Sequence, residues 1–338
     1  MSNIYDRREN ESLMDYEERL YRNQSLYGLS WEEINNLLGI NQHYDSTRKA
    51  SYGYIKRIDQ EKEHQFDKSV MIINDLHLPF ERNDILEIVN KHKNEIDTLV
   101  IGGDLIDCQS ISFFPKIKTL TLEYELVYAY NFLKRVRKIL DNNQKIIIIN
   151  GNHEERWYRD ICNLHENLHE KDMQKFINPN LIDMIIEGFT IYEDNKKHKY
   201  KGTQNIIYIP HWFVNIDNKI IVAHPKDFSR VDGKMCEKTS EHFLNRDEEF
   251  EVICFGHTHK YSQMTVSRRQ GVYVIENGCM CQPMQYSDVG KLNYTPQSYC
   301  YTIIRYNNNE KINYNNIKVY HLDELYDKNH MINYNVKL

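Results

Sequence analysis

The sequence predicts an α/β fold, a four-layer α/β/β/α sandwich preceded by a small all-helical module at the N-terminus. The first observation is a set of short, apolar, β-branched runs, typical of strands buried on both faces; they cover residues 70–73, 99–101, 145–149 and 252–255. The second is that helical patterns separate the first three runs. The third is a C-terminal part whose alternating apolar residues and Asn- and Gly-rich turns predict antiparallel strands.

The first three runs belong to βαβ units. Apolar residues at helical spacing predict a helix over residues 84–92 and a long amphipathic helix over residues 122–140. Strand and helix in alternation require a mostly parallel inner sheet with right-handed crossovers. The basic cluster at residues 134–138 is expected to be a solvated face, although a groove for a phosphate backbone would need similar charges.

Residues 11–65 predict a separate helical module. A helical period covers residues 13–27, and Ser30 with Glu33 forms a capping box that opens a second helix, which ends at Gly39. A third helix begins near Ser46 and is basic. Short helix, Gly-containing turn and basic helix outline a helix-turn-helix, similar to small modules appended to many phage-type proteins. We expect either DNA contact by this module or a helical cap or dimerisation arm; the candidate nucleic-acid-binding residues are Arg48, Lys49, Lys56 and Arg57.

The domain boundaries follow from these patterns. Residues 1–66 are expected to form the module and a polar linker at 59–64, and residues 67–338 the α/β domain. An insertion at 153–205, helical through residue 186, is expected to cap the turn after residue 150 and to govern substrate access. His165, His169 and His211 are expected to be surface or core histidines. Strands over 263–266, 272–275, 299–305 and 312–320 are expected to complete the second sheet.

Composition excludes several classes of protein. With 338 residues and 41% hydrophobic residues the chain can bury a sizeable core. The charged first ten residues lack a secretory h-region, and no apolar run is long enough to span a bilayer. Seven scattered cysteines fit reduced thiols, and the Cys279–Cys281 pair has no second pair at zinc spacing. The net charge of −6 argues mildly against a general nucleic-acid binder, although bound cations would offset acidic ligands.

Residues that can hold a metal recur at the ends of the apolar runs. One such residue alone would be an ordinary turn residue, but the repeated placement after strands predicts a common metal site. The set is rich in nitrogen and lacks thiolates, which favours Mn²⁺, Fe²⁺, Zn²⁺ or Ni²⁺ over Ca²⁺. The candidate ligands are Asp75, His77, Asp104, Asn152, His224, His257 and His259.

The series D-L-H, G-D-L-I-D, G-N-H-E, a solitary strand-end His and G-H-T-H resembles the complete motif series of the calcineurin-like metallophosphoesterases, over about residues 70–274. The resemblance implies two divalent ions, Mn²⁺ favoured, one held by Asp75, His77 and His259 and the other by Asn152, His224 and His257. Asp104 would bridge them, because a carboxylate has two oxygens to share. Two ions roughly 3.5–4 Å apart clamp an in-line displacement at phosphorus by a bridging hydroxide.

The same resemblance assigns catalysis to His153, which would protonate or stabilise the leaving oxygen. Asp107 resembles the carboxylate that pairs with this histidine in the protein-phosphatase branch, and its alternative role is a loop or helix-cap aspartate. Glu154 is shared with that branch, although the helix dipole favours a glutamate there in any case.

Two departures separate the chain from the protein-phosphatase branch. Cys108 stands where that branch has a phosphate-gripping arginine, and the complete G-H-T-H is a pair that the branch lacks. Both favour nuclease and phosphodiesterase relatives, of a phage type or like DNA-repair exonucleases. Phosphate binding is then expected from Arg156 or Lys226, and for each a solvated surface cation is the alternative.

We therefore expect a two-metal phosphodiesterase acting on nucleic acid or nucleotides, cytoplasmic (in the host cytoplasm if phage-encoded), without a membrane partner and with a homodimer as one arrangement. A phosphomonoesterase acting on nucleotides or phosphoproteins is the alternative enzyme. A DNA-binding or assembly protein that uses the fold as a scaffold is the alternative of another class.

Overall fold

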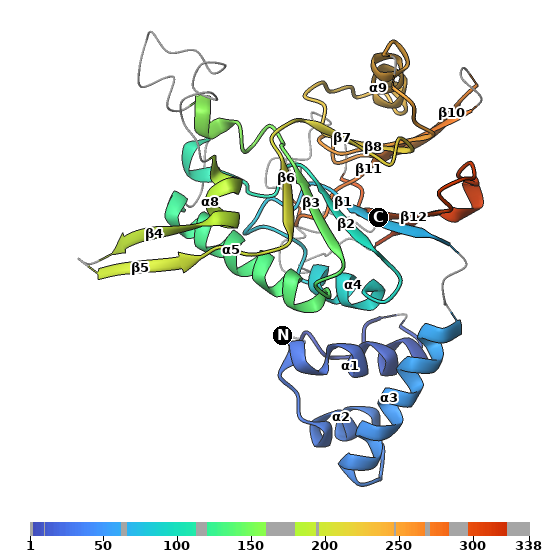
Figure 1. The fold of residues 1–338 in the computed structure, drawn as a ribbon. Helices are drawn as coiled ribbons and strands as arrows, with labels where there is room; N and C mark the ends of the chain where they lie inside the picture. The colour runs from blue at the N-terminus through green and yellow to red at the C-terminus, as the bar shows by residue number, and fades with distance from the viewer. Residues whose placement is uncertain are drawn as a thin grey trace, which may run out of the picture.

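Two mixed β-sheets stacked face to face form the body of the molecule (Figure 1). The computed structural model describes residues 3–9, 11–61, 66–112, 120–159, 180–193, 196–246, 248–267, 271–283 and 297–322. The six-stranded sheet runs in the order β13 (Ile317–His321), β12 (Cys300–Tyr306), β1 (Lys68–Ile73), β2 (Thr98–Gly102), β3 (Lys145–Ile149) and β6 (Ile206–Ile209). The five-stranded sheet runs β10 (Tyr261–Val266), β11 (Val272–Asn277), β9 (Val252–Phe255), β8 (Ile220–Ala223) and β7 (Phe213–Ile216).

Helices cover the outer face of each sheet. A large apolar cluster packs α4 (Ile85–His92), α5 (Leu122–Ile139) and α8 (Leu181–Glu187) with residues of the six-stranded sheet. On the other side, α9 (Lys234–Leu244) buries Met235, Cys236 and Phe243 against the five-stranded sheet. A third cluster, which includes Val100 and Val222, joins the two inner faces. The predicted four-layer α/β/β/α sandwich is confirmed.

The parallel part of the first sheet also follows the prediction. β1, β2, β3 and β6 pair in parallel, so their carboxyl ends meet at one edge. In the second sheet β8 and β9 are parallel too. The turns that follow these strands therefore converge where the two sheets face each other, as in other open α/β sheets.

The expected arrangement of the C-terminal strands is confirmed for β10 and β11, which pair antiparallel in the second sheet, and is wrong for β12 and β13. β12 pairs antiparallel with β1, and β13 with β12, so both close the first sheet rather than the second. β11 pairs in parallel with β9. Nearly all of β12 is buried, which fits an interior strand beside β1. Residues 312–320 contain a 3₁₀ turn, Tyr314–Asn316, before β13 begins; a second such turn is Gln109–Ile111.

The insertion after the third strand contains more than the expected helical cap. Residues 160–179, and with them His165 and His169, lie outside the described residues. α8 follows, and β4 (Gly188–Glu193) and β5 (Lys196–Lys201) then form a separate two-stranded hairpin. Figure 1 shows this hairpin extending away from the body beside α5 and α8.

The N-terminal module is a three-helix unit, α1 (Leu13–Tyr27), α2 (Trp31–Leu38) and α3 (Tyr44–Glu61), around its own apolar core. The capping box of Ser30 and Glu33 is present, and Gly39 ends α2 at φ 67°, a left-handed conformation that favours glycine. Helix α3 begins before Ser46 and continues to Glu61, into the stretch expected to be a linker; residues 62–65 are outside the described ranges.

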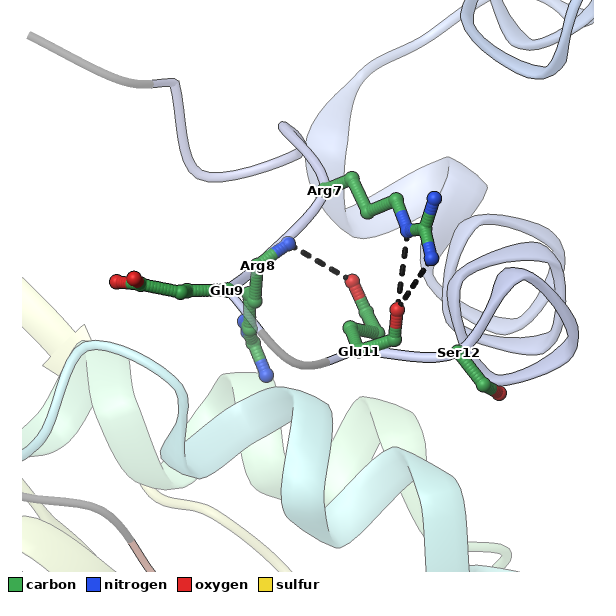
Figure 2. Close-up of a pocket in the computed structure, with 5 residues that line it drawn as sticks. All are labelled: Arg7, Arg8, Glu9, Glu11 and Ser12. Atoms are coloured by element: carbon green, nitrogen blue, oxygen red, sulfur yellow. Dashed lines mark hydrogen bonds between the residues drawn. The ribbon is translucent and has the colours of Figure 1, made fainter.

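The module packs on α4 through α1. Asn90 donates to the Asn23 side chain at 2.9 Å, and Arg8 pairs with buried Glu87 at 2.5 Å. Figure 2 shows a pocket beside this contact, in which Arg7 and the Arg8 backbone bind Glu11. Arg7 and the Arg8 backbone are thus hydrogen-bonded within the chain, and we assign no ligand to this pocket. None of the helices in the described ranges has the length and apolar character needed to cross a membrane.

Candidate metal centre

The seven predicted ligands come from five strand ends. Asp75 and His77 follow β1, Asp104 follows β2, and Asn152 follows β3. From the second sheet, His224 follows β8, and His257 and His259 follow β9. The seven residues are spread over positions 75–259 of the sequence, and the structure brings their side chains together in one cluster at the junction of the sheets.

Asp104 lies at the centre of this cluster. Its Oδ2 is 3.8 Å from His77 Nε2 on one side and 3.2 Å from His224 Nε2 on the other. The residue is almost fully buried. The same carboxylate therefore faces both groups of imidazoles, which is the position required of a bridging ligand.

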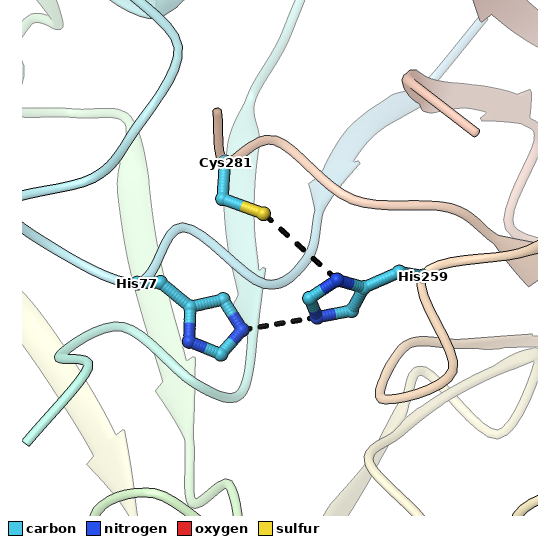
Figure 3. Close-up of side chains that lie close together, drawn as sticks. All are labelled: His77, His259 and Cys281. Carbon is cyan, nitrogen blue, oxygen red and sulfur yellow. Dashed lines mark hydrogen bonds between the residues drawn. The ribbon is translucent and has the colours of Figure 1, made fainter. Parts of the chain in front are cut away.

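The first group contains His77, His259 and Asp75. The Nε2 atoms of His77 and His259 face each other at 3.0 Å (Figure 3). Asp75 Oδ1 is 3.4 Å from His259 Nε2. His77 Nδ1 donates to Asp107 at 2.9 Å, so its Nε2 presents a lone pair in the neutral form. Convergence of two nitrogens and a carboxylate oxygen on one point fits a shared cation.

The second group is arranged around the Asn152 carboxamide. Its Oδ1 is 2.6 Å from His257 Nδ1 and 3.2 Å from His224 Nε2. His224 donates its other ring proton, on Nδ1, to the Gly102 carbonyl at 2.8 Å. That bond fixes the ring orientation and leaves Nε2 for coordination, as hydrogen bonds to the far nitrogen of metal-bound histidines do.

Charge balance supports the same conclusion. Asp75 and Asp104 are buried carboxylates, and their burial is costly unless positive charge lies nearby. Burial lowers the pKa of His224, but Asp104 and Asp75 outweigh it and raise that pKa to about 10. Burial and then His224 lower the pKa of His257 to about 4. The carboxylates at the centre of the cluster thus attract positive charge, whereas the His257 imidazole stays neutral. Both properties fit the binding of divalent cations.

Cys281 contacts the cluster from behind His259. Its Sγ is 3.9 Å from His259 Nδ1, while His259 Nε2 faces His77 (Figure 3). The amide of Gln297 is 2.8 Å from the same Nδ1. The thiol and the amide therefore contact the imidazole at its second nitrogen. Cys281 also lies close enough to His77 and His259 to share a metal ion with them, so the thiolate-free ligand set stays a prediction.

The backbone of the cluster is strained. Asp75, His77, Asp104, His257 and His259 all have positive φ, between 48° and 84°. Each such residue costs of the order of 1–3 kcal/mol, and such residues gather at functional sites. Among the other described non-glycine residues with positive φ, Cys108 follows Asp107 directly, and the rest are Asn205, Asp217 and Asn218, residue types that adopt that conformation more readily.

Glycines bring the turns together. A Cβ at Gly151 would lie 2.2 Å from the backbone nitrogen and Oδ1 of Asp104, and one at Gly256 would lie 2.4 Å from Asp75 Oδ2. Contacts this short are excluded for real side chains. The glycines of the G-N-H-E and G-H-T-H motifs are therefore needed for close approach to the carboxylates.

His153 lies at the edge of the cluster with Asp107 and Arg156. Its Nδ1 donates to the Asp107 carbonyl at 2.7 Å and lies 3.2 Å from the Asp107 carboxylate. Its Nε2 accepts from Arg156 at 2.7 Å and lies 3.7 Å from Asp104 Oδ2. Burial raises the pKa of Asp107, but hydrogen bonds from His153 and His77 lower this pKa by more than burial raises it. The net shift is downward, so Asp107 is ionised.

The remaining candidates divide into two groups. Arg156 is buried and also donates to the Asp107 carbonyl at 2.8 Å, so it belongs to the cluster. Lys226 has a 60% exposed side chain and pairs with Glu155 at the rim. His211 is not among the residues that contact the ligands, and its ring packs against Trp212 and Phe213. The basic residues of α3, Arg48, Lys49, Lys56 and Arg57, are exposed on the separate module.

Glu154 has a structural role that the sequence left open. It is buried and accepts from the backbone nitrogens of Gly151 at 3.0 Å and Ile106 at 2.9 Å. Burial, followed by the nearby Asp104, raises its pKa to about 7. Glu154 thus ties the turn that carries His153 to the turn that carries Asp104.

Sequence reasoning missed a buried amide network behind the ligands. Asn74 donates to the Gly102 carbonyl at 3.0 Å and accepts from Asn277 at 2.7 Å, and Thr302 donates to Asn277 at 2.6 Å. The network joins both sheets directly under Asp75. In the sequence, the signal of this network was Asn74, a polar residue between the apolar run at 70–73 and the D-L-H motif.

Comparison with known proteins adds two family matches. Residues 68–261 match the calcineurin-like phosphoesterase family, and residues 2–69 match the YonJ N-terminal domain. No curated protein matches the chain.

Solved structures with low sequence identity are also similar. Vps29 of Chaetomium thermophilum is 10% identical, covering 77% of this chain and 97% of that one, with a TM-score of 0.31. A predicted phosphoesterase from Streptococcus pneumoniae is 10% identical over 75% and 98%, with a TM-score of 0.27. A protein serine/threonine phosphatase from Saccharomyces cerevisiae is 12% identical over 81% and 90%, with a TM-score of 0.36. Since the first family model covers more than half of the sequence and its region contains the buried His/Asp cluster, the chain belongs to the calcineurin-like phosphoesterases, with a YonJ N-terminal domain in front.

Proposed function

We propose that the chain is a dinuclear-metal phosphodiesterase that hydrolyses phosphodiester bonds in nucleic acid or nucleotides. The observation that carries the metal part is the position of Asp104 between the two imidazole groups. The preference for a diester rests on the complete G-H-T-H motif and on Cys108, which leaves the second motif without a phosphate-gripping arginine. In this proposal residues 1–66 form the accessory module and residues 67–338 the catalytic domain, with 153–205 as its insertion.

The ligand set proposed for the two ions is Asp75, His77 and His259 on one side, Asn152, His224 and His257 on the other, and Asp104 between them. When bound, two divalent cations neutralise phosphate oxygens and lower the pKa of water. Mn²⁺ suits the mixture of imidazole, carboxylate and carboxamide ligands, with Fe²⁺, Zn²⁺ and Ni²⁺ as alternatives.

His153 is the proposed proton donor to the leaving oxygen. Asp107 faces its Nδ1 and fixes the orientation of the ring, so that Nε2 lies on the side of Asp104. With Nε2 protonated, Arg156 no longer has an acceptor there, and its guanidinium becomes available to the phosphate. Arg156 is therefore preferred to Lys226 as the phosphate-binding residue, since Lys226 is exposed and paired at the rim.

The test is hydrolysis of bis-p-nitrophenyl phosphate, p-nitrophenyl phosphate, and single- and double-stranded DNA, with Mn²⁺ added after chelation. We expect cleavage of the diester and of DNA, and its loss in Asp104→Asn. His153→Ala should lower kcat by about 10²–10⁴-fold and leave the metal content unchanged. Cleavage of the monoester alone would instead make the chain a phosphatase, and a metal-loaded protein that cleaves none of these substrates would support the scaffold alternative.

A further inference from the structure

The hairpin of β4 and β5 has two different faces. Alternate residues of a strand point to opposite sides, and directly paired residues of antiparallel strands share a side. Phe189 pairs with Tyr200, and their rings stack at 4.7 Å between centroids. Both rings also pack edge-on against Tyr130 of α5. This side therefore anchors the hairpin to the body.

The opposite side is basic. Lys197, Lys199 and Lys201 alternate with the anchoring residues of β5 and are all exposed. Their cross-strand partners are Tyr192, Thr190 and Gly188, so none of the three faces a carboxylate across the hairpin. None of them forms an ion pair within the part of the chain that the structure describes. Strand geometry spaces the three charges at about 6.6 Å along one line.

An exposed aromatic ring lies on the same side. Tyr192 pairs with Lys197 and is 72% exposed, which is high for a large apolar ring. Lysines in a row with an exposed tyrosine combine the two features that bind single-stranded nucleic acids, since cations track the backbone and aromatic rings stack on bases. Lys196 lies on the other side of the hairpin.

From these observations we infer that the Lys197–Lys199–Lys201 face of the hairpin, with Tyr192, binds a single strand of nucleic acid. The inference rests on the proposed function, because it supplies the surface that holds a polymeric substrate of the same phosphoesterase. The hairpin belongs to the insertion between Asn152 and His224, so a strand bound there is held by the segment that joins two proposed metal ligands.

Protection of the hairpin against self-association is an alternative role for the three lysines. An isolated two-stranded hairpin has two open edges, and lysines on exposed edges oppose pairing with other chains. If protection were their whole role, their replacement would promote self-association without any effect on nucleic-acid binding. The experiment below measures both quantities.

The full-length chain with His153→Ala, which is expected not to cut the probe, is titrated against a fluorescein-labelled 20-nucleotide oligothymidylate in Mn²⁺, with fluorescence anisotropy as the readout. Against this background, Lys197→Gln, Lys199→Gln and Lys201→Gln together should weaken binding by at least about tenfold, and should reduce the slope of log affinity against log salt by about 2. Tyr192→Ala should weaken binding by about fivefold or more. The matched control replaces three exposed lysines elsewhere, Lys91, Lys138 and Lys145, with glutamine and should bind within about twofold of its parent.

Several outcomes would overturn the inference. They are absence of binding in the parent, equal loss in the control variant, and a hairpin variant that self-associates in gel filtration but binds unchanged. Hairpin-dependent binding to phosphatidylserine vesicles in place of the oligonucleotide would assign the face to a membrane surface. Failure of the proposed function is detected separately, because the hairpin variant in the otherwise wild-type chain should hydrolyse bis-p-nitrophenyl phosphate at the unaltered rate if the chain is a phosphodiesterase.

Discussion

At the residue scale, buried carboxylates differ in what compensates their burial. Asp107 receives two histidine donors, and its pKa falls. Glu81 accepts a hydrogen bond at 2.7 Å from Tyr128, and its Oε2 has no hydrogen-bond partner among the described residues. Burial therefore raises the pKa of Glu81 more than the Tyr128 hydrogen bond lowers it. The two carboxylates should contribute to stability in opposite pH ranges.

For Glu81 the direction of the pH dependence follows from its raised pKa. Between the ordinary value of 4.5 and the raised folded-state value, the folded chain holds a proton that the unfolded chain has lost. The Glu81 contribution to the free energy of unfolding therefore falls as pH rises through this window. Glu81→Gln keeps an acceptor for Tyr128 and removes the titration, so its stability relative to wild type should increase from pH 4.5 upward.

The measurement is urea unfolding of both chains from pH 4.5 to pH 8 at a fixed Mn²⁺ concentration. A difference in unfolding free energy that stays constant over this range would contradict the prediction.

Residues also mark the limit of what the sequence could predict at the site. Each of the seven proposed ligands follows a strand and belongs to a recognisable motif, so the members of the cluster could be predicted from the sequence; their role as ligands stays a prediction. Gln297 and Asn277 could not be found in this way, because they approach the ligands through long-range packing. Arg156 was found, but its attachment to His153 was not, since two residues of helical turn separate them and spacing alone does not distinguish an inward from an outward side chain.

At the element scale, the turns after the strands are as important as the strands. Gly151 has no room for a Cβ because Asp104 fills the space, whereas Gly53 in the middle of α3 has nothing within 4 Å of such an atom. The same substitution should therefore have opposite effects in a ligand turn and in an exposed helix.

Gly151→Ala should lower the unfolding free energy by about 1–3 kcal/mol or more, because Asp104 must shift, and should weaken Mn²⁺ binding. Gly53→Ala should raise it by about 0.5–1 kcal/mol, since alanine is the better helix former. Denaturant unfolding and metal titration of both variants check this pair. Similar effects of the two substitutions on stability would show that the close approach in the turn is not a constraint.

Element boundaries were predictable where local chemistry sets them. The Ser30–Glu33 capping box and the apolar runs placed α2 and the first three strands correctly. The partners of β12 were not predictable, because strand pairing between distant segments depends on which sheet edge is still unpaired once the other strands are in place. The basic hairpin was also missed, since its apolar residues are too few to stand out from the surrounding charges.

At the scale of the whole molecule, two units with separate cores are joined by an interface that combines polar pairs with an apolar contact, in which Leu26 of α1 packs against the cluster that contains α4. The module has its own apolar cluster, and its contacts with α4 include the Asn90–Asn23 and Arg8–Glu87 pairs. None of the module residues contacts the metal ligands among the described residues. The catalytic cluster should therefore function without the module.

Removal of residues 1–65 should leave turnover of bis-p-nitrophenyl phosphate within about twofold of the full chain. It should lower Tm by several degrees, because α4 loses its cover and Glu87 loses Arg8. Turnover assays and calorimetry of the truncated chain, loaded with Mn²⁺, test both parts. A truncated chain that stays folded but is inactive would mean that the module contributes to the catalytic site.

The amide network behind the ligands also bears on synthesis of the chain. Asn277 holds the carbonyl of Ile72, which lies 205 residues earlier in the sequence. At a ribosomal rate of about 5–20 residues per second, β1 waits roughly 10–40 s for this partner. For most of that interval Asp75 and His77 have been made while His259 has not, so the newly made chain cannot assemble the proposed first metal site until β9 and the turn after it have left the ribosome.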